Sequence, residues 1–117
     1  MRILLVDDET EFVATLAERL SFRKMEVDFA TTAADALTMV GNKDYDLAIL
    51  DMKMPVTSGI ELKALLEKQY PRMKFIFLTG HGSEDDYLAG SSGACCYLVK
   101  PINIDILVAK IKEAIEG

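Results

Sequence analysis

The sequence predicts an α/β domain in which an open sheet of five parallel strands lies between two layers of helices, as a three-layer sandwich. Five short apolar runs are spaced along the 117 residues, and longer segments with helical periodicity lie between them. Strict alternation of strand and helix implies right-handed crossovers, which place helices on both faces of a parallel sheet. The length is that of one domain, so we expect residues 1–117 to form a single unit.

The apolar runs predict both the strands and one edge of the sheet. Four runs are almost continuously apolar, as is typical of strands covered on both faces. Residues 25–30 instead alternate polar and apolar side chains, which suits an edge strand. The predicted strands are Ile3–Val6, Val27–Ala30, Leu47–Leu50, Phe75–Leu78 and Cys95–Val99.

The intervening segments carry helix signals of different strength. Phe12, Leu16 and Leu20 repeat every four residues, and Gly41-Asn42 is expected to stop the second helix. The segment from Ser83 to Ser91 is weaker, because the glycines and serines that follow are poor helix formers. The remaining apolar positions are Ala33, Ala36, Leu37 and Val40, then Ile60, Leu62, Leu65 and Leu66, and finally Ile104, Leu107, Val108, Ile111 and Ile115.

Two helices begin with clear capping residues. Ser58 and Glu61 have the spacing of a capping box, in which each side chain satisfies a backbone N–H of the other residue. Asn103 precedes the last apolar periodic segment and is placed to cap it. The third helix is therefore expected to begin near residue 59 and the last near residue 104.

Charge and composition exclude several functions. The net charge of −6 and the isoelectric point near 4.7 argue against direct binding to a nucleic acid or to an anionic membrane. No apolar stretch approaches the ~18 residues of a membrane helix, and no leader opens the chain. Cys95 and Cys96 are neighbours, so they cannot form a disulfide framework, and a cytoplasmic location is the simpler expectation.

Polar side chains follow four of the predicted strands directly. Asp7 and Asp8 follow the first strand, Asp51 the third, Thr79 the fourth, and Lys100 the fifth. Functional groups of open parallel sheets lie at the carboxyl ends of the strands, near a switch in strand order. We therefore expect these five residues to converge on one edge of the sheet.

A group of three carboxylates needs compensating positive charge. Two carboxylates 4 Å apart repel by about 4 kcal/mol at an effective dielectric constant of 20. The lysine and a hard divalent cation are the candidates, and oxygen ligands suit Mg²⁺ better than zinc. The alternative is that the acids are unrelated cap and turn residues, since Asp8 with Glu11 has the spacing of an N-cap. Three acids, a hydroxyl and a lysine at four strand ends favour a shared site.

These residues belong to five short motifs that occur in order along the chain. Each motif is weak alone, but five at the ends of the correct strands are specific. With them the whole chain resembles the receiver domain of two-component response regulators, which implies a flavodoxin-like (βα)5 fold with strand order 2-1-3-4-5. The motifs are Leu5–Glu9, Leu50–Pro55, Ser58–Gly59, Leu78–Gly82 and Tyr97–Pro101.

The resemblance implies a magnesium-dependent phosphoacceptor site. Asp51 would be the nucleophile and the phosphorylation site, taking a phosphoryl group from the phosphohistidine of a sensor histidine kinase or a histidine phosphotransfer protein. Mg²⁺ would be held by Asp7, Asp8, Asp51 and the backbone carbonyl of Lys53. The domain would thus be a signalling switch that catalyses its own phosphorylation, and not a metabolic enzyme.

The resemblance also implies roles around the phosphoryl group. Lys100 would pair with the phosphoryl oxygens, and Thr79 would hydrogen-bond them and move, while Tyr97 swings inward as the second part of the switch. Lys53 and His81 occupy the two positions that tune phosphoryl lifetime. Neither side chain suits the presentation of an attacking water, so we expect slow dephosphorylation. The Lys100–Pro101 bond is expected to be cis.

The sequence says less about what the switch controls. A downstream effector domain or protein is implied, and the sequence is expected to be a free-standing or N-terminal receiver. The segment after Thr79 is about one residue shorter than usual, and a frayed helix at Ser83–Ser91 would weaken the usual output face. At most a weak phosphorylation-dependent dimer is therefore expected. Cys95 and Cys96 are interpreted as two small buried hydrophobic residues.

Three alternatives differ from this interpretation. A phosphatase of the haloacid-dehalogenase type would carry Asp-x-Asp after the first strand, whereas Asp51 follows the third strand and has Lys53 two residues later. A flavin-binding electron carrier would need a phosphate loop rich in Ser, Thr and Gly, where this chain has Asp7–Thr10. A receiver-like interaction module that is never phosphorylated is the third alternative, although all acceptor-site residues are present.

Overall fold

The computed structural model describes residues 1–80 and 96–116, which contain five strands and four helices. The strands are β1 (Arg2–Val6), β2 (Glu26–Ala30), β3 (Leu47–Asp51), β4 (Lys74–Thr79) and β5 (Cys96–Val99). The helices are α1 (Thr10–Ser21), α2 (Ala33–Asn42), α3 (Gly59–Gln69) and α5 (Ile104–Glu116). The predicted helix at Ser83–Ser91, His81, Cys95 and the side chain of Cys96 lie outside the described parts.

The five strands are parallel and follow the order β2-β1-β3-β4-β5, which confirms the predicted fold class and strand order. Val6 pairs with Leu50, so the residues that follow them, Asp7 and Asp51, lie level at adjacent strand ends. Thr79 pairs with Val99, which places Lys100 just beyond the end of β4. The register thus brings the predicted site residues to one edge.

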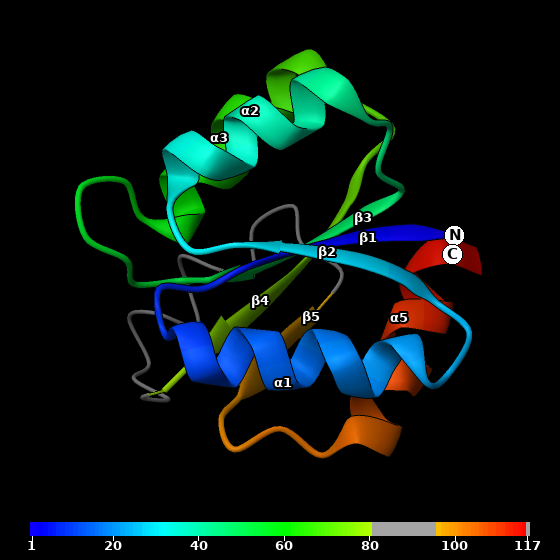
Figure 1. The fold of residues 1–117 in the computed structure, drawn as a ribbon. Coiled ribbons are helices and arrows are strands. Elements are labelled where there is room, and N and C mark those ends of the chain that lie inside the picture. Colours follow the sequence, from blue (N-terminus) through cyan, green and yellow to red (C-terminus); the bar gives the residue numbers. More distant parts are fainter. Residues whose placement is uncertain (81–95, 117) are drawn as a thin grey trace.

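Two layers of helices cover the sheet, as Figure 1 shows with α2 and α3 on one face and α1 and α5 on the other. Alternate residues of each strand pack on opposite faces of the sheet, because successive side chains of a strand point to opposite sides. Ile3 and Leu5 pack into the cluster shared with α1 and α5, whereas Leu4 and Val6 pack into the cluster shared with α2 and α3. The near-continuous apolar pattern of β1 follows from this double burial.

The helix ends agree with the sequence in two places and differ in one. The capping box of α3 is present, with Ser58 accepting from the backbone N–H of Glu61, and Asn103 Oδ1 accepts from the first turn of α5. The predicted stop of α2 at Gly41-Asn42 is wrong, because the helix includes both residues. Gly41 adopts helical backbone angles without a penalty severe enough to end the helix.

The edge position of β2 is confirmed. Its alternating pattern does not separate buried from exposed residues cleanly, because Asp28 is half-buried while Phe29 is exposed. The Tyr45 hydroxyl donates to Asp28 Oδ2 at 2.7 Å, and Lys43 Nζ lies 3.2 Å from the same oxygen. These contacts hold the Asp28 carboxylate ionised and keep its pKa below the ordinary value. None of the described helices is both long and apolar enough to cross a bilayer.

Candidate functional site: an acidic pocket with a lysine

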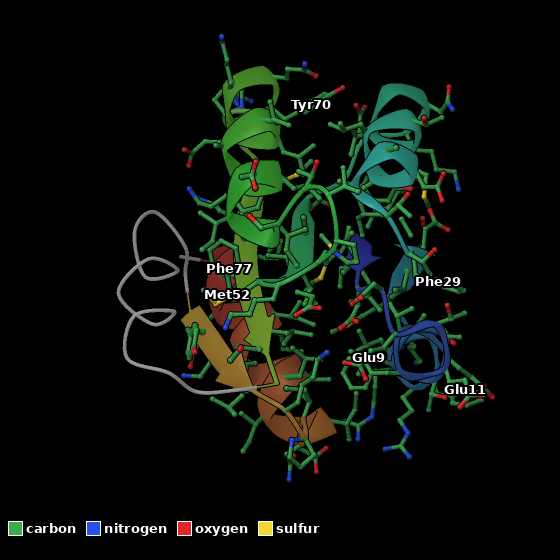
Figure 2. The ribbon with its side chains drawn as sticks, turned by 90° about the vertical axis from the view of Figure 1, so that its left-hand side faces the viewer. Glu9, Glu11, Phe29, Met52, Tyr70 and Phe77 are labelled. Atoms are coloured by element: carbon green, nitrogen blue, oxygen red, sulfur yellow. The ribbon has the colours of Figure 1, made fainter. Side chains whose placement is uncertain are left out.

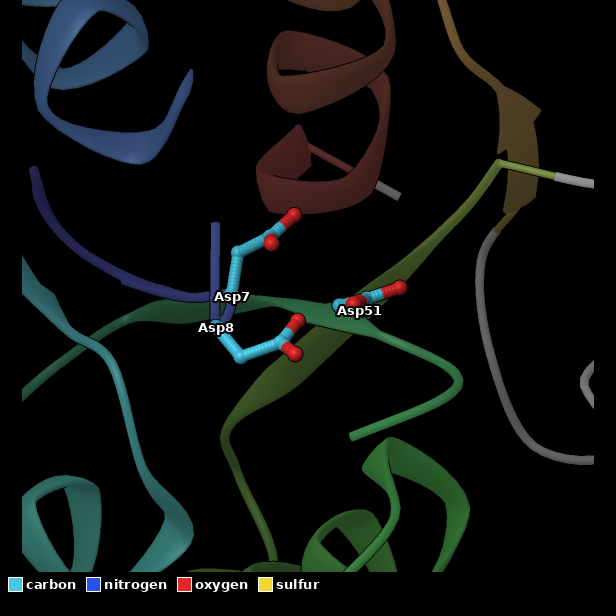
Figure 3. Close-up of side chains that lie close together, drawn as sticks. All are labelled: Asp7, Asp8 and Asp51. Atoms are coloured by element: carbon cyan, nitrogen blue, oxygen red, sulfur yellow. The ribbon is translucent and has the colours of Figure 1, made fainter. Parts of the chain in front are cut away.

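Three carboxylates gather where β1 and β3 end. Asp7 and Asp8 follow β1, and Asp51 is the last residue of β3, so its backbone is held in the strand ladder. One oxygen from each carboxylate lies within 4.8 Å of the others. Figure 3 shows the three side chains close together. Asp7 and Asp51 are buried and Asp8 is exposed, so the cluster has a protein side and an open side.

Asp51 has the most strongly perturbed carboxyl group of the site. Burial raises its pKa to about 7, and the charge of Asp7 and a hydrogen bond with Asp8 act in the same direction. Lys100 and the Lys53 backbone oppose this increase. Without a cation, the Asp51 carboxyl is therefore only partly ionised at neutral pH.

Asp7 is tied on both of its oxygens. Oδ1 accepts a hydrogen bond of 2.9 Å from the backbone N–H of Glu9, and Oδ2 lies 2.7 Å from Lys100 Nζ. Burial raises the pKa of Asp7, while both of these contacts lower it. These two contacts fix the direction in which the Asp7 carboxylate faces the pocket.

Lys100 brings the positive charge to the site from the far strand. Its Nζ lies 2.7 Å from Asp7 and 2.8 Å from Glu9 Oε1, and 4.5 Å from the centre of the Phe12 ring. Burial lowers the pKa of the ammonium, but the carboxylates around it raise the pKa more, so the net shift is upward. The Lys100–Pro101 bond is cis, as the resemblance to receiver domains implies.

Gly59 explains why α3 begins close to Asp51. A Cβ atom at residue 59 would lie 2.0 Å from the backbone oxygen of Asp51, which is far inside any permitted contact. The Gly59 N–H also donates to the backbone oxygen of Met52 at 3.1 Å. Only glycine therefore allows the start of α3 to pack on the strand end that carries Asp51.

The two predicted switch residues lie on neighbouring strands. Thr79 is the buried last residue of β4, and its backbone oxygen accepts from the Lys100 N–H at 2.7 Å. Tyr97 is half-buried on β5 and packs at the border of the α2–α3 cluster. Of the two predicted lifetime residues, Lys53 has an exposed side chain beside Asp51, and His81 lies outside the described residues.

The interpretation of Asp8 as the N-cap of the first helix is wrong. Helix α1 begins at Thr10, which puts Glu9 at the N-cap, and the Glu9 side chain makes no capping hydrogen bond. The sequence reasoning missed the contacts of Glu9 and Phe12 with Lys100. The only available signal was a third acid directly after the Asp pair.

The donor set fits a hard divalent cation. The cluster offers carboxylate oxygens and no sulfur or imidazole, which matches the preferences of Mg²⁺ and not those of zinc. A pocket of about 640 Å³ adjoins the cluster on the side of Asp8 and is lined by Asp8, Thr10, residues 31–34 and Pro55–Thr57. The three carboxylates can therefore hold a hard cation where β1 and β3 end.

Comparisons with known proteins identify the family. The family described as the response regulator receiver domain matches residues 3–112. Transcriptional regulatory protein TcrA of Mycobacterium tuberculosis is 36% identical over 113 residues, covering 96% of this chain but only 45% of TcrA. The chain thus spans less than half of that relative.

Solved structures agree with this result. A CheY-like response regulator receiver domain protein from Methanospirillum hungatei has a TM-score of 0.91 and 37% identity, covering 98% of this chain and 93% of its own. A response regulator from Burkholderia pseudomallei, solved with a phosphorylated aspartic acid and a calcium ion, has a TM-score of 0.85 and 28% identity, covering 99% and 74%. The chain belongs to the response regulator receiver domains of two-component systems.

Proposed function

We propose that this receiver is a phosphoacceptor and that Asp51 is the acceptor residue. The observation that carries the proposal is a buried carboxylate held beside two further acids and a lysine at adjoining strand ends. An Asp51 carboxylate oxygen forms a new P–O bond as the P–N bond of a phosphohistidine breaks, and the imidazole leaves with the bonding electron pair. A carboxylate is an established nucleophile for such transfer.

Asp7, Asp8, Asp51 and the backbone carbonyl of Lys53 are the residues that would hold Mg²⁺. When bound, the cation neutralises charge on the transferring phosphoryl group. The fixed orientation of Asp7 by the Glu9 N–H means that little reorganisation of that carboxylate is needed. Burial of Asp51 and Asp7 keeps water from competing for the same oxygens.

Lys100 and Thr79 complete the site. The Lys100 ammonium pairs with phosphoryl oxygens, and the Thr79 hydroxyl hydrogen-bonds them from the end of β4. The phosphoryl group adds a charge of about −1.5 to −2 next to these donors. Movement of Thr79, followed by Tyr97 on the adjacent strand, transmits the change to the surface that meets an effector.

The test is phosphorylation by acetyl phosphate with Mg²⁺, followed by intact-mass measurement of the wild type, Asp51→Asn and Asp44→Asn. Asp44 is an exposed aspartate between α2 and β3 and serves as the matched control. We expect one alkali-labile phosphate on the wild type and on Asp44→Asn, and none on Asp51→Asn. An unmodified wild type would instead favour a receiver-like interaction module.

The lifetime of the phosphoryl group is proposed to be long. Lys53 and His81, the residues two after Asp51 and two after Thr79, are not suited to orient a water for attack. After removal of the donor, the phosphate should persist for minutes or longer in the mass assay. Loss within seconds would contradict the assignment of these two positions.

The partners follow from the same chemistry. A sensor histidine kinase or a histidine phosphotransfer protein would supply the phosphoryl group, and the effector would be another domain or protein, as the transcriptional relatives suggest. Four further expectations stay predictions. They are a cytoplasmic location, one domain over residues 1–117, a weak phosphorylation-dependent dimer, and the absence of direct nucleic-acid or membrane binding.

A further inference from the structure

The Lys100 ammonium has an anchor outside the proposed metal ligands. Its Nζ lies 2.8 Å from Glu9 Oε1, although the two residues are 91 positions apart in the sequence. We propose that Glu9 is a positioning residue that holds Lys100 in the unphosphorylated protein and yields it to the phosphoryl group. This inference rests on the function proposed above and deepens it.

The conformation of Glu9 supports a dedicated contact with Lys100. Glu9 is the N-cap of α1, a position from which short side chains accept hydrogen bonds from the first turn. Its carboxylate makes no such bond and contacts Lys100 instead. A negative charge at a helix N-terminus is also favoured by the helix dipole, so this position suits a carboxylate that contacts an ammonium.

The same helix supplies a second surface for the ammonium. The Phe12 ring, one turn after Glu9, has its centre 4.5 Å from Lys100 Nζ, within the range of a cation–π contact. The N-cap and first turn of α1 thus contribute a carboxylate and an aromatic ring, and Asp7 contributes a second carboxylate. The resting place of Lys100 is determined largely by α1.

Glu9 and a phosphoryl group on Asp51 would compete for the N–H donors of Lys100. The Lys100 ammonium has three N–H donors, of which one is used in a hydrogen bond to Glu9, and it lies 2.7 Å from Asp7 Oδ2 as an ion pair. A phosphoryl group on Asp51 needs donors from Lys100, and Asp7 is proposed to be a metal ligand. Glu9 is the contact that can be given up, because its side chain is 62% exposed and water can replace the ammonium.

The test measures binding of beryllium trifluoride, a phosphoryl mimic, at saturating Mg²⁺ by ¹⁹F NMR. We expect Glu9→Gln to bind it about three-fold more tightly than the wild type, the size expected for loss of a solvent-exposed competing ion pair. Glu11→Gln is the matched control, because Glu11 lies on the opposite side of α1 in Figure 2 and carries the same charge. It should differ from the wild type by less than about 1.5-fold.

Repeating the binding measurement in a Lys100→Met variant distinguishes an effect of Glu9 through Lys100 from a general effect of its charge. In Lys100→Met, the Glu9→Gln substitution should lose its effect and match Glu11→Gln. The contact can also be tested without a bound anion. In metal-free protein, the ¹⁵Nζ resonance of Lys100 in Glu9→Gln should be shifted from its position in the wild type, whereas that in Glu11→Gln should not.

Equal affinities of the wild type and Glu9→Gln for beryllium trifluoride, or an effect of Glu9→Gln that persists in Lys100→Met, would overturn the proposal. A wild type that binds no beryllium trifluoride would instead count against the function itself.

Discussion

Asp51 carries an electrostatic cost in the folded protein that an asparagine would remove. Its pKa rises from 3.8 to about 7 on folding, so the native state binds the proton more tightly than the unfolded chain. The penalty is absent below the unfolded pKa, grows as the pH rises from about 4 to 7, and is complete above pH 7. A shift of this size corresponds to at most about 4 kcal/mol.

Asp51→Asn should therefore stabilise the metal-free protein by about 2 kcal/mol at pH 8 and by much less at pH 4. Urea unfolding in a chelator at the two pH values measures the difference. Asp44→Asn should show no such dependence. A gain for Asp51→Asn that is the same at both pH values would mean that the carboxyl group is not strained by burial.

Val56 adopts a backbone conformation that disfavours its side chain. Its φ is 70°, in the left-handed region, and its side chain is fully exposed between β3 and α3. A β-branched residue in this region is strained, at a cost of about 1–2 kcal/mol. No packing contact offsets that cost, since the side chain is surrounded by solvent.

Val56→Gly should raise the free energy of unfolding by about 1 kcal/mol, because relief of strain exceeds the added entropy of the unfolded chain. Val56→Ala is the control, since it keeps the Cβ atom and hence most of the strain. Chemical denaturation of both variants checks the expectation, and an equal gain from alanine and glycine would refute it.

At the scale of elements, Gly41 and Gly59, the glycines of the helices that the structure describes, differ in what surrounds them. Gly59 lies against the Asp51 carbonyl, whereas a Cβ atom added at Gly41, in the last turn of α2, would have nothing within 4 Å of it. The same substitution to alanine therefore meets a backbone clash at one site and open space at the other. Comparing Gly59→Ala with Gly41→Ala therefore separates the effect of a packing clash on stability from the effect of helix propensity.

Gly59→Ala should destabilise the protein by about 2 kcal/mol or more and slow phosphorylation of Asp51, because α3 must move away from β3. Gly41→Ala should stabilise it by about 0.5–1 kcal/mol, through helix propensity alone. Thermal unfolding and the acetyl phosphate assay measure the two effects. Changes of the same sign in both variants would show that the close approach at Gly59 is unimportant.

The elements also show what the sequence could predict. Apolar runs identified all five strands, and the caps at Ser58 and Asn103 identified the starts of α3 and α5, because these signals are local. The strand order came from the family resemblance and not from periodicity. Gly41-Asn42 misled because glycine weakens a helix without necessarily ending it.

Contacts between side chains that are far apart along the chain could not be predicted from the sequence. That strand ends converge could be predicted, since topology alone brings Asp7, Asp51 and Lys100 to one edge. The Glu9–Lys100 contact depends on where α1 begins and on the conformation of two long side chains. The left-handed conformation of Val56 likewise depends on how the chain returns from β3 to α3, which no local pattern indicates.

At the scale of the whole molecule, a cation bound in the acidic pocket would stabilise the folded state. A ligand that binds only the folded state stabilises it by about 2.7 kcal/mol at 100 times its dissociation constant. For a domain of this size, that corresponds to a rise of the melting temperature of roughly 10 °C. The effect would arise because three carboxylates that repel one another in the free protein would share one cation.

Mg²⁺ at 100 times its dissociation constant should therefore raise the melting temperature of the wild type by roughly 10 °C. The rise should be largely lost in Asp8→Asn, which removes an exposed ligand without disturbing the core. Asp35→Asn, with an exposed carboxylate in the first turn of α2, should keep the full rise. Scanning calorimetry with Mg²⁺ and with a chelator compares the three proteins, and an equal rise in all of them would place the cation elsewhere.

The hydrogen bond from Gly59 to Met52 has a consequence for how this protein can be altered. It closes the base of the loop at 53–58, so the ends of that loop are fixed independently of its length. Extending a closed loop costs only about 0.6 kcal/mol for each doubling of its length. The residues from Met54 to Thr57 should therefore tolerate an inserted foreign peptide, which would be displayed next to the acidic pocket while Asp51 stays in place.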